Sequence, residues 1–197
     1  MKQLTRQDLW SLEQYSERRQ SFRTEVMAHK KNRQITLGTH ARFCFEDQIT
    51  MRYQIQEMLR IERIYEAGAI QEELDTYNPL VPSGKNLKAT FMLEYDDIDQ
   101  RKIMLQKLRG IEKQLWIEVE GMPRITPIAD EDLERENDEK TSSVHFLRYE
   151  FSVEQISALR RGAKLSLGID TLLIEPNTMV VLDPIRSALL EDFDTTV

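Results

Sequence analysis

The first 84 residues combine long runs of helical hydrophobic spacing with one short stretch of alternating residues. In the helical runs, apolar residues recur every three or four positions, which is the spacing of a helix with one buried face. The alternating stretch surrounds Gly38 and is typical of a β-hairpin. Asn78-Pro79 and then Pro82-Ser83-Gly84 end the helical pattern. The elements predicted here are helices over about 6–30, 46–67 and 69–76 and strands over 34–38 and 41–45.

Residues 85–197 change to strands with one apolar face, separated by short helices. A strand, a helix that starts at a capping box, a glycine and a second strand occur in this order twice. Asp97 with Gln100 starts the first of these helices, and Ser152 with Gln155 starts the second. The elements predicted here are strands over 87–95, 115–119, 124–128, 144–151 and 165–169, helices over about 97–109, 152–161 and 184–193, and a short helix plus loop over 130–142.

Two successive β-α-β units predict an α+β fold with a ferredoxin-like antiparallel sheet of order βαββαβ. We expect one domain over residues 1–197, made of a mainly helical half with a short β-hairpin (1–84) and a sheet half (85–197). The long helix over 46–67 has more apolar surface than the helix over 6–30 can cover. The helical half is therefore expected to pack on the sheet.

Composition narrows the class of protein. The net charge is −7, which argues against general nucleic-acid affinity, because that affinity requires Lys and Arg to displace phosphate counterions. Cys44 is the only cysteine, so an internal disulfide and a thiolate zinc site are both excluded. The first residues lack the apolar run of a signal peptide, and no segment approaches the ~20 apolar residues that span a bilayer. We expect a cytoplasmic protein without membrane or nucleic-acid partners, and leave homo-oligomers open.

The long predicted helix carries carboxylates on its apolar side. On a helical wheel Glu62 falls in the middle of the apolar arc, and Glu57 falls on its flank. A carboxylate in apolar surroundings costs several kcal/mol unless it is paired, protonated or facing a cavity. We therefore predict that Glu62 is buried with a partner from the sheet half, with Arg148 or His145 as the first candidates.

Two interpretations of these charges remain open: they fix neighbouring elements, or they form a polar pocket. His145 lies on the apolar face of the strand over 144–151, where it is either a satisfied core residue or a general acid or base. The three histidines have no metal-ligand spacing, and no cofactor motif is present. The residues of the candidate polar pocket are Arg52, Gln56, Glu57, Arg60, Glu62, His145 and Arg148.

Four segments together resemble an uncharacterised bacterial family, catalogued only as a domain of unknown function. They read FEDQITMRYQIQEMLRIERI, EELDTYNPLVPSGKNLKATFMLEY, IADEDLERENDEKTSSVHFLRYEF and DPIRSALLEDF. The resemblance covers nearly the whole chain and is most specific from Glu46 to Asn78. One departure is GIDTLLIEPNT, which stands where the family has a short His-Pro turn, so no site near residues 170–177 is carried over.

The resemblance implies a single-domain cytoplasmic protein in a redox or peroxide-stress setting, because genes of the family neighbour those for rubrerythrin-like and iron–sulfur-cluster proteins. No catalytic residues are established for the family, so none are assigned here.

Two function classes follow from the sequence. The favoured one is a non-catalytic accessory or binding protein that serves a redox partner, since no catalytic constellation is present. The alternative is a small enzyme that uses Glu57 or Glu62 with His145 as acid–base groups. That alternative loses its site if both glutamates are bonded to arginines and His145 lies far beyond the ~3 Å reach of proton transfer.

Overall fold

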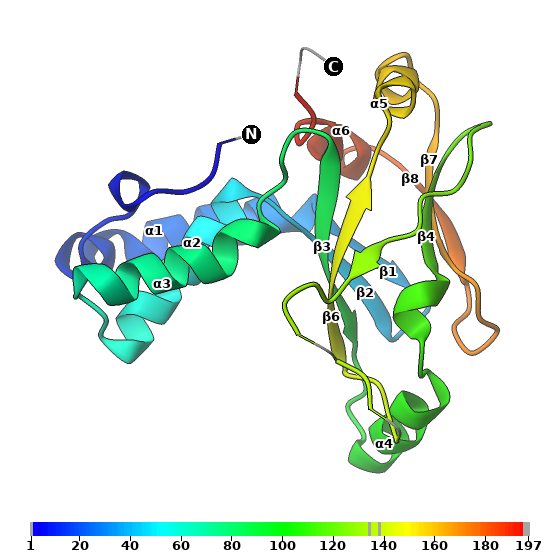
Figure 1. Ribbon diagram of the computed structural model, residues 1–197, viewed down its shortest axis with the longest axis horizontal. Coiled ribbons are helices and arrows are strands. Elements are labelled where there is room, and N and C mark those ends of the chain that lie inside the picture. The colour runs from blue at the N-terminus through cyan, green and yellow to red at the C-terminus, as the bar shows by residue number, and fades with distance from the viewer. Residues whose placement is uncertain (1, 134, 138, 195–197) are drawn as a thin grey trace.

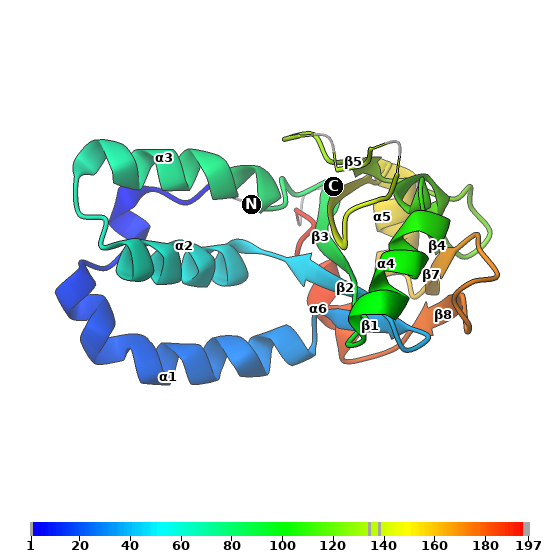
Figure 2. The same ribbon diagram turned by 90° about the horizontal axis from the view of Figure 1, so that it is seen from below.

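The computed structural model describes residues 2–133, 135–137 and 139–194. Two antiparallel sheets occupy one end of the molecule, and three helices lie side by side at the other end (Figures 1 and 2). The helices are α1 (Leu12–Lys31), α2 (Gln48–Glu62), α3 (Ala67–Tyr77), α4 (Ile98–Lys107), α5 (Val153–Arg160) and α6 (Ile185–Leu190), with 3-10 turns η1 (Arg6–Asp8), η2 (Asn78–Leu80) and η3 (Ile111–Gln114). The strands are β1 (Gln34–Leu37), β2 (Ala41–Glu46), β3 (Asn86–Leu93), β4 (Leu115–Val119), β5 (Ile128–Ala129), β6 (Val144–Glu150), β7 (Leu165–Ile169) and β8 (Thr178–Val181).

The predicted long helix over 46–67 is shorter than expected. α2 ends at Glu62 because Arg63 adopts a left-handed conformation with a φ of 56°. The amide of Ile64 donates to the carbonyl of Leu59 at 2.9 Å, which closes the last turn. The chain then turns, and α3 starts at Ala67. No glycine or proline marks this break in the sequence.

α2 buries its apolar side within the helical end. It packs against α1 and α3, and Met51, Ile55 and Leu59 join Leu4 and Leu74 in one cluster. The expectation that the sheet covers this side of α2 is therefore not confirmed. The three helices instead extend away from the sheets (Figure 2).

Most of the predicted strands form, but the single ferredoxin-like sheet is not confirmed. In place of the strand predicted over 124–128 the structure has an isolated bridge at Ile125 and the two-residue β5, and β8 was not predicted. The larger sheet has the order β1-β2-β3-β6-β5, and the smaller sheet has the order β4-β7-β8. β3 pairs with β6 as a ferredoxin-like sheet requires, but β4 pairs with β7 instead of with β6. The reason is that β2 takes the free edge of β3 and β5 takes the free edge of β6. Both crossovers, through α4 and through α5, consequently lead from the larger sheet to the smaller one.

The two sheets share one hydrophobic core. Phe43, Phe91 and Leu147 of the larger sheet belong to the same buried cluster as Ile117 and Leu167 of the smaller sheet. α4 and α5 close opposite ends of this arrangement (Figure 1). Each strand thus buries its apolar face against the other sheet and against the ends of the helices.

Candidate functional site

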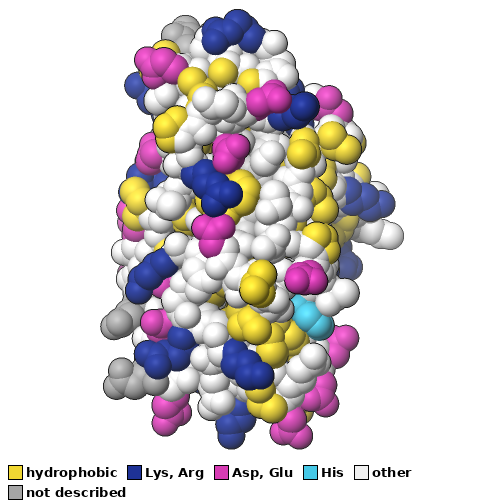
Figure 3. Space-filling view, turned by 90° about the vertical axis from the view of Figure 1, so that its right-hand side faces the viewer, with side chains coloured by type: hydrophobic (Ala, Val, Ile, Leu, Met, Phe, Trp, Pro, Cys, Tyr) yellow, Lys and Arg dark blue, Asp and Glu magenta, His cyan; other side chains and the backbone are white. Residues whose placement is uncertain are grey.

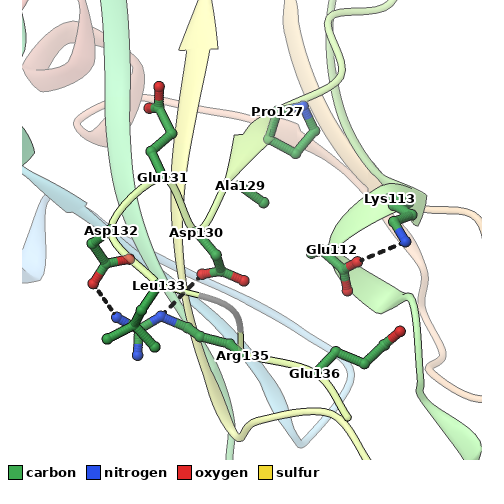
Figure 4. Close-up of a pocket in the computed structure, with 10 residues that line it drawn as sticks. All are labelled: Glu112, Lys113, Pro127, Ala129, Asp130, Glu131, Asp132, Leu133, Arg135 and Glu136. Carbon is green, nitrogen blue, oxygen red and sulfur yellow. Dashed lines mark hydrogen bonds and ion pairs between the residues drawn. The ribbon is translucent and has the colours of Figure 1, made fainter. Parts of the chain in front are cut away.

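A polar pocket lies beside the start of β6, where the chain that follows β5 passes over the end of the core (Figure 4). Its volume is about 560 Å³. Carboxylates dominate its lining, which consists of Glu112, Lys113, Pro127, Ala129, Asp130, Glu131, Asp132, Leu133, Arg135 and Glu136.

Asp130 has an unusual backbone at the edge of this pocket. Its φ is 53°, in the left-handed region that few residues other than glycine adopt. The Asp130 amide donates to the carbonyl of Phe146 at 2.8 Å, and the Phe146 amide donates to Asp130 Oδ1 at 2.9 Å. Strand β6 therefore holds Asp130 in this conformation from both its backbone and its side chain. Backbone conformations that are unfavourable by themselves and are held in place by neighbouring bonds are found preferentially at functional sites.

His145 stands behind Asp130 and does not reach the pocket. Its side chain is fully buried, and its Nδ1 lies 2.6 Å from Asp130 Oδ2. Its Nε2 lies 2.9 Å from Thr141 Oγ1 and 3.2 Å from the carbonyl oxygen of Ser142. Both ring nitrogens are therefore occupied by protein groups. His145 can influence a ligand in this pocket through Asp130.

The other charged groups of the pocket are mostly paired. Arg135 places its Nε 3.1 Å from Asp130 Oδ1, although this buried nitrogen makes no hydrogen bond among the described residues, and its guanidinium also contacts Asp132. Glu131 accepts two hydrogen bonds from Arg148 at 2.8 and 2.6 Å, which lower the pKa of Glu131. These pairs fix the loop against β6.

Glu112 is the exception among these carboxylates. Only 8% of the residue is exposed, and its Oε2 is buried without a hydrogen-bond donor among the described residues. Its Oε1 lies 3.6 Å from Lys113 Nζ. A buried carboxylate oxygen without a donor costs about 1–3 kcal/mol or more, so it calls for an explanation such as a bound ligand. Figure 4 shows the Glu112 carboxylate projecting into the space opposite Arg135.

The candidate residues on α2 form a different cluster. The guanidinium of Arg52 lies over the Trp10 ring, 4.0 Å from its centroid. The side-chain amide of Gln56 accepts from the Trp10 amide at 2.7 Å and donates to the Trp10 carbonyl at 3.3 Å. These contacts attach the segment before α1 to α2, which supports the structural interpretation of both residues.

Glu57 joins α2 to α1. It accepts a hydrogen bond from Tyr15 Oη at 2.5 Å and two from Arg19 at 2.7 and 2.9 Å. The Arg19 guanidinium and the Tyr15 hydroxyl lower the pKa of Glu57 to about 2 despite its partial burial. Arg60, half exposed, adds a longer ion pair of 3.6 Å to the same carboxylate.

The prediction that Glu62 is buried is wrong. Glu62 is the last residue of α2 and is exposed, as is the neighbouring Ile61, which is 62% exposed. The helical wheel assumed a helix that continues to residue 67, whereas the chain turns at Arg63 and leaves the final turn facing solvent. The expected partners are engaged elsewhere: His145 contacts Asp130, and Arg148 pairs with Glu131 and Glu150.

The structure thus separates the candidate residues into two groups. Arg52, Gln56, Glu57, Arg60 and Glu62 lie on α2 at the helical end, and His145 and Arg148 lie on β6 in the larger sheet. It brings Glu112, Asp130 and Arg135 together, which sequence reasoning missed. Asp130 and Arg135 lie in the segment 130–142, which was predicted only as a short helix plus loop. Glu112 lies in η3, the 3-10 turn before β4. The one available signal was the density of charge just before the strand that carries His145.

Residues 3–193 match the family described as "Protein of unknown function (DUF3501)". The chain belongs to this family. It is similar to a solved structure of a novel protein of unknown function from Burkholderia pseudomallei K96243, with 44% identity and a TM-score of 0.91. That match covers 98% of this chain and 100% of the other. No curated protein matches this DUF3501 chain.

In the described part of this DUF3501 chain, no cluster of three or more His, Cys, Asp or Glu side chains is arranged to hold a metal ion. None of the helices in the same part is long and apolar enough to cross a membrane.

Proposed function

We propose that this DUF3501 protein is a binding protein that takes a small organic cation in the pocket beside β6. The observation that carries the proposal is Glu112, whose Oε2 is buried beside the pocket without a donor. This oxygen has almost no accessible surface, so an ammonium group in the pocket reaches it only when the Glu112 carboxylate turns toward the pocket. Donation to the carboxylate then removes the cost of burying the oxygen unpaired.

The charge of the lining favours the same class of ligand. Five of its residues are acidic, and two, Lys113 and Arg135, are basic. A pocket walled by one sign of charge concentrates ligands of the opposite sign. Arg135 already contacts Asp130 and Asp132, so it does not neutralise Glu112. The pocket therefore favours a cation over an anion.

The alternative of an acid–base enzyme has less support. Glu57 is held by Arg19 and Tyr15 on α2, Glu62 faces solvent, and no contact joins either of them to His145 among the described residues. A general acid or base must come within hydrogen-bond reach of its substrate, whereas His145 is fully buried and bonded at both nitrogens. These contacts favour binding over catalysis.

The test is a titration of the full chain with amines of increasing length, namely ethanolamine, putrescine and spermidine, each compared with its form acetylated at every nitrogen. We expect the amines to raise the melting temperature and the fully acetylated forms to have no effect, because acetylation of every nitrogen removes the charge. Glu112→Gln should abolish the response, whereas Glu72→Gln, an exposed glutamate on α3, should preserve it. An equal response in Glu112→Gln and wild type would overturn the proposal.

We further propose that the protein acts in the cytoplasm as an accessory to a protein partner of a redox or peroxide-stress system. This part rests on the family resemblance, which implies rubrerythrin-like or iron–sulfur partners. Native mass spectrometry of the protein purified from its own host tests it. A complex with such a partner is expected, and a chain that carries neither partner nor ligand would contradict the accessory role.

A further inference from the structure

We propose that Lys88 belongs to a second binding site, which takes a neutral carbonyl compound with an aromatic or aliphatic body and holds it as an imine. This site is distinct from the pocket that contains Glu112, although Glu131 and Asp132 line both. The inference does not depend on the cation proposed for that pocket.

The cavity that contains Lys88 lies where the helical end meets the larger sheet. Its volume is about 320 Å³. α3 ends beside the larger sheet (Figure 2), and residues of α3 and η2 form one side of the cavity opposite β6. The apolar part of the lining consists of Tyr77, Pro79, Leu80, Phe146 and Leu147. A concave wall of this kind with a few polar groups suits a small ligand that has an apolar body.

Lys88 has no partner for its charge. It is half-buried on β3, and no hydrogen bond or ion pair engages its amine among the described residues. Its cross-strand neighbours are Glu46 on β2 and Arg148 on β6. Glu46 accepts instead from the hydroxyls of Thr50 and Thr90, each at 2.7 Å. Arg148 would carry the same charge as Lys88, and like charges directly opposite each other destabilise a sheet, so this place favours a neutral amine.

The other charges of the lining favour a neutral ligand. Asp75 accepts from the side-chain amide of Gln71 at 2.8 Å, and Glu131 and Asp132 pair with arginines. None of these carboxylates engages Lys88. Three carboxylates in the wall repel an anion, and the two basic side chains beside them remove the advantage of a cation.

A lysine in this setting is a nucleophile. Burial and the charge of Arg148 lower the pKa of Lys88, against the opposing effect of Glu131 and Glu150. An apolar wall and a neighbouring cation are the two features that activate lysines for imine formation. The amine nitrogen attacks the carbonyl carbon, and a C=N bond replaces the C=O bond. Both amine hydrogens leave with the oxygen as water, so the step requires neither an oxidant nor a reductant.

The test is reductive trapping of the full chain with a limiting amount of benzaldehyde and cyanoborohydride at about pH 7, followed by mass mapping of the labelled lysines. Lys and Arg side chains stand at the surface of the sheet end (Figure 3), and exposed lysines of this kind are protonated at this pH. We therefore expect most of the lysine-bound label on Lys88. Lys88→Arg, which keeps the charge and cannot form the imine, should lose that label. Lys102→Arg, at an exposed position on α4, should keep it.

A second measurement uses wild type alone, so it decides the matter even if Lys88→Arg does not fold. Benzyl alcohol has the same ring and cannot form an imine. An excess of it should occupy the cavity and slow the labelling of Lys88, while the labelling of Lys102 stays unchanged. Label spread evenly over the exposed lysines, or a Lys88 that benzyl alcohol does not protect, would each overturn the proposal.

Discussion

Arg33, just after the C-cap of α1, forms an ion pair with Asp192 beyond the end of α6, and both residues are 1% exposed. Arg33 also donates to the carbonyls of Phe45 and Ala188, each at 3.0 Å, and its Nε lies 3.4 Å from Asp47 Oδ2. One guanidinium thus joins α1, β2 and α6. We propose on this basis that residues 1–197 unfold as a single domain.

Removing Arg33 should destabilise the whole protein. Above about pH 7, Arg33→Ala leaves the buried Asp192 without its partner, and breaking a buried pair from one side costs about 3–5 kcal/mol. Arg23→Ala, at an exposed position on α1, should stay within about 0.5 kcal/mol of wild type. Urea denaturation followed by circular dichroism measures both. Two separate transitions in wild type would contradict the single domain.

Asp192 should make stability depend on pH. Burial raises the pKa of Asp192 to about 7, against the opposing effect of Arg33. The unfolded value is about 3.9, so between these values the folded state binds a proton that the unfolded state releases. The free energy of unfolding should therefore fall as pH rises from about 4 to about 7, and the loss is complete above that window.

Asp192→Asn tests this pH dependence, because an amide does not titrate. Its unfolding free energy should change less with pH across the same window than that of wild type. Asp99→Asn, at an exposed position in the first turn of α4, is the control and should keep the wild-type profile. Identical profiles for wild type and Asp192→Asn would mean that Asp192 stays ionised throughout.

Replacing Glu57 should destabilise the protein, whereas replacing Glu62 should not. The sequence had predicted a buried, paired Glu62, which would be costly to replace. Glu57→Ala removes the acceptor of Tyr15 and Arg19 and should cost about 1–3 kcal/mol. Glu62→Ala changes an exposed residue at the end of α2 and should stay within about 0.5 kcal/mol. Thermal melts of the two variants decide between them. The pKa of Glu57 is lower in the folded state than in the unfolded state. The ionised Glu57 should therefore add to the free energy of unfolding above about pH 4.3, and this stabilisation should be lost as pH falls toward about 2.

The sequence predicted β3, β6 and β7 because alternation is a local signal. The capping box at Ser152 is present, and Asp97 caps α4 as expected, although without the reciprocal bond of the predicted capping box. The pairing of strands was not predictable in the same way. Each strand shows one apolar face, but nothing local says that β2 and β5 take the places beside β3 and β6.

The candidate site was harder to predict than the fold. His145 was singled out correctly as a histidine on an apolar face, yet its partner Asp130 depends on a left-handed turn that no residue pattern announces. Glu112 lies in a short 3-10 turn and is brought to the pocket by the tertiary fold. The placement of Glu62 failed because one left-handed residue, Arg63, ended the helix early.

Asp130→Asn should weaken the loop around the pocket. Asparagine tolerates the left-handed backbone, so the change isolates the loss of the carboxylate that faces His145 and Arg135. We expect a cost of about 1–3 kcal/mol, as for other hydrogen bonds that involve a charged group. Asp132→Asn, whose side chain is 46% exposed, should have little effect in the same melts. Equal shifts would show that the contact of Asp130 with His145 adds no stability.

Two glycine substitutions should act in opposite directions. A Cβ on Gly168 would lie 2.0 Å from Cζ2 of Trp116, so Gly168→Ala should force the indole to move and cost about 1–3 kcal/mol. A Cβ on Gly68 meets nothing within 4 Å, and Gly68 lies in α3. Gly68→Ala should therefore stabilise the protein by about 0.5–1 kcal/mol. Chemical denaturation gives both values. An unchanged free energy of unfolding in Gly168→Ala would mean that the Trp116 side chain moves aside at no cost.

The ion pair of Arg33 with Asp192 also constrains how the chain can be made. The two residues are 159 positions apart, so the partner of Arg33 leaves the ribosome 159 residues after Arg33 does. Until then the guanidinium beside α1 has no Asp192 and no Ala188 carbonyl to bind. The helical end is translated before these partners, so its junction with the sheets is complete only after Ala188 and Asp192 have been made. A nascent chain stalled before α6 should therefore remain accessible to protease at that junction.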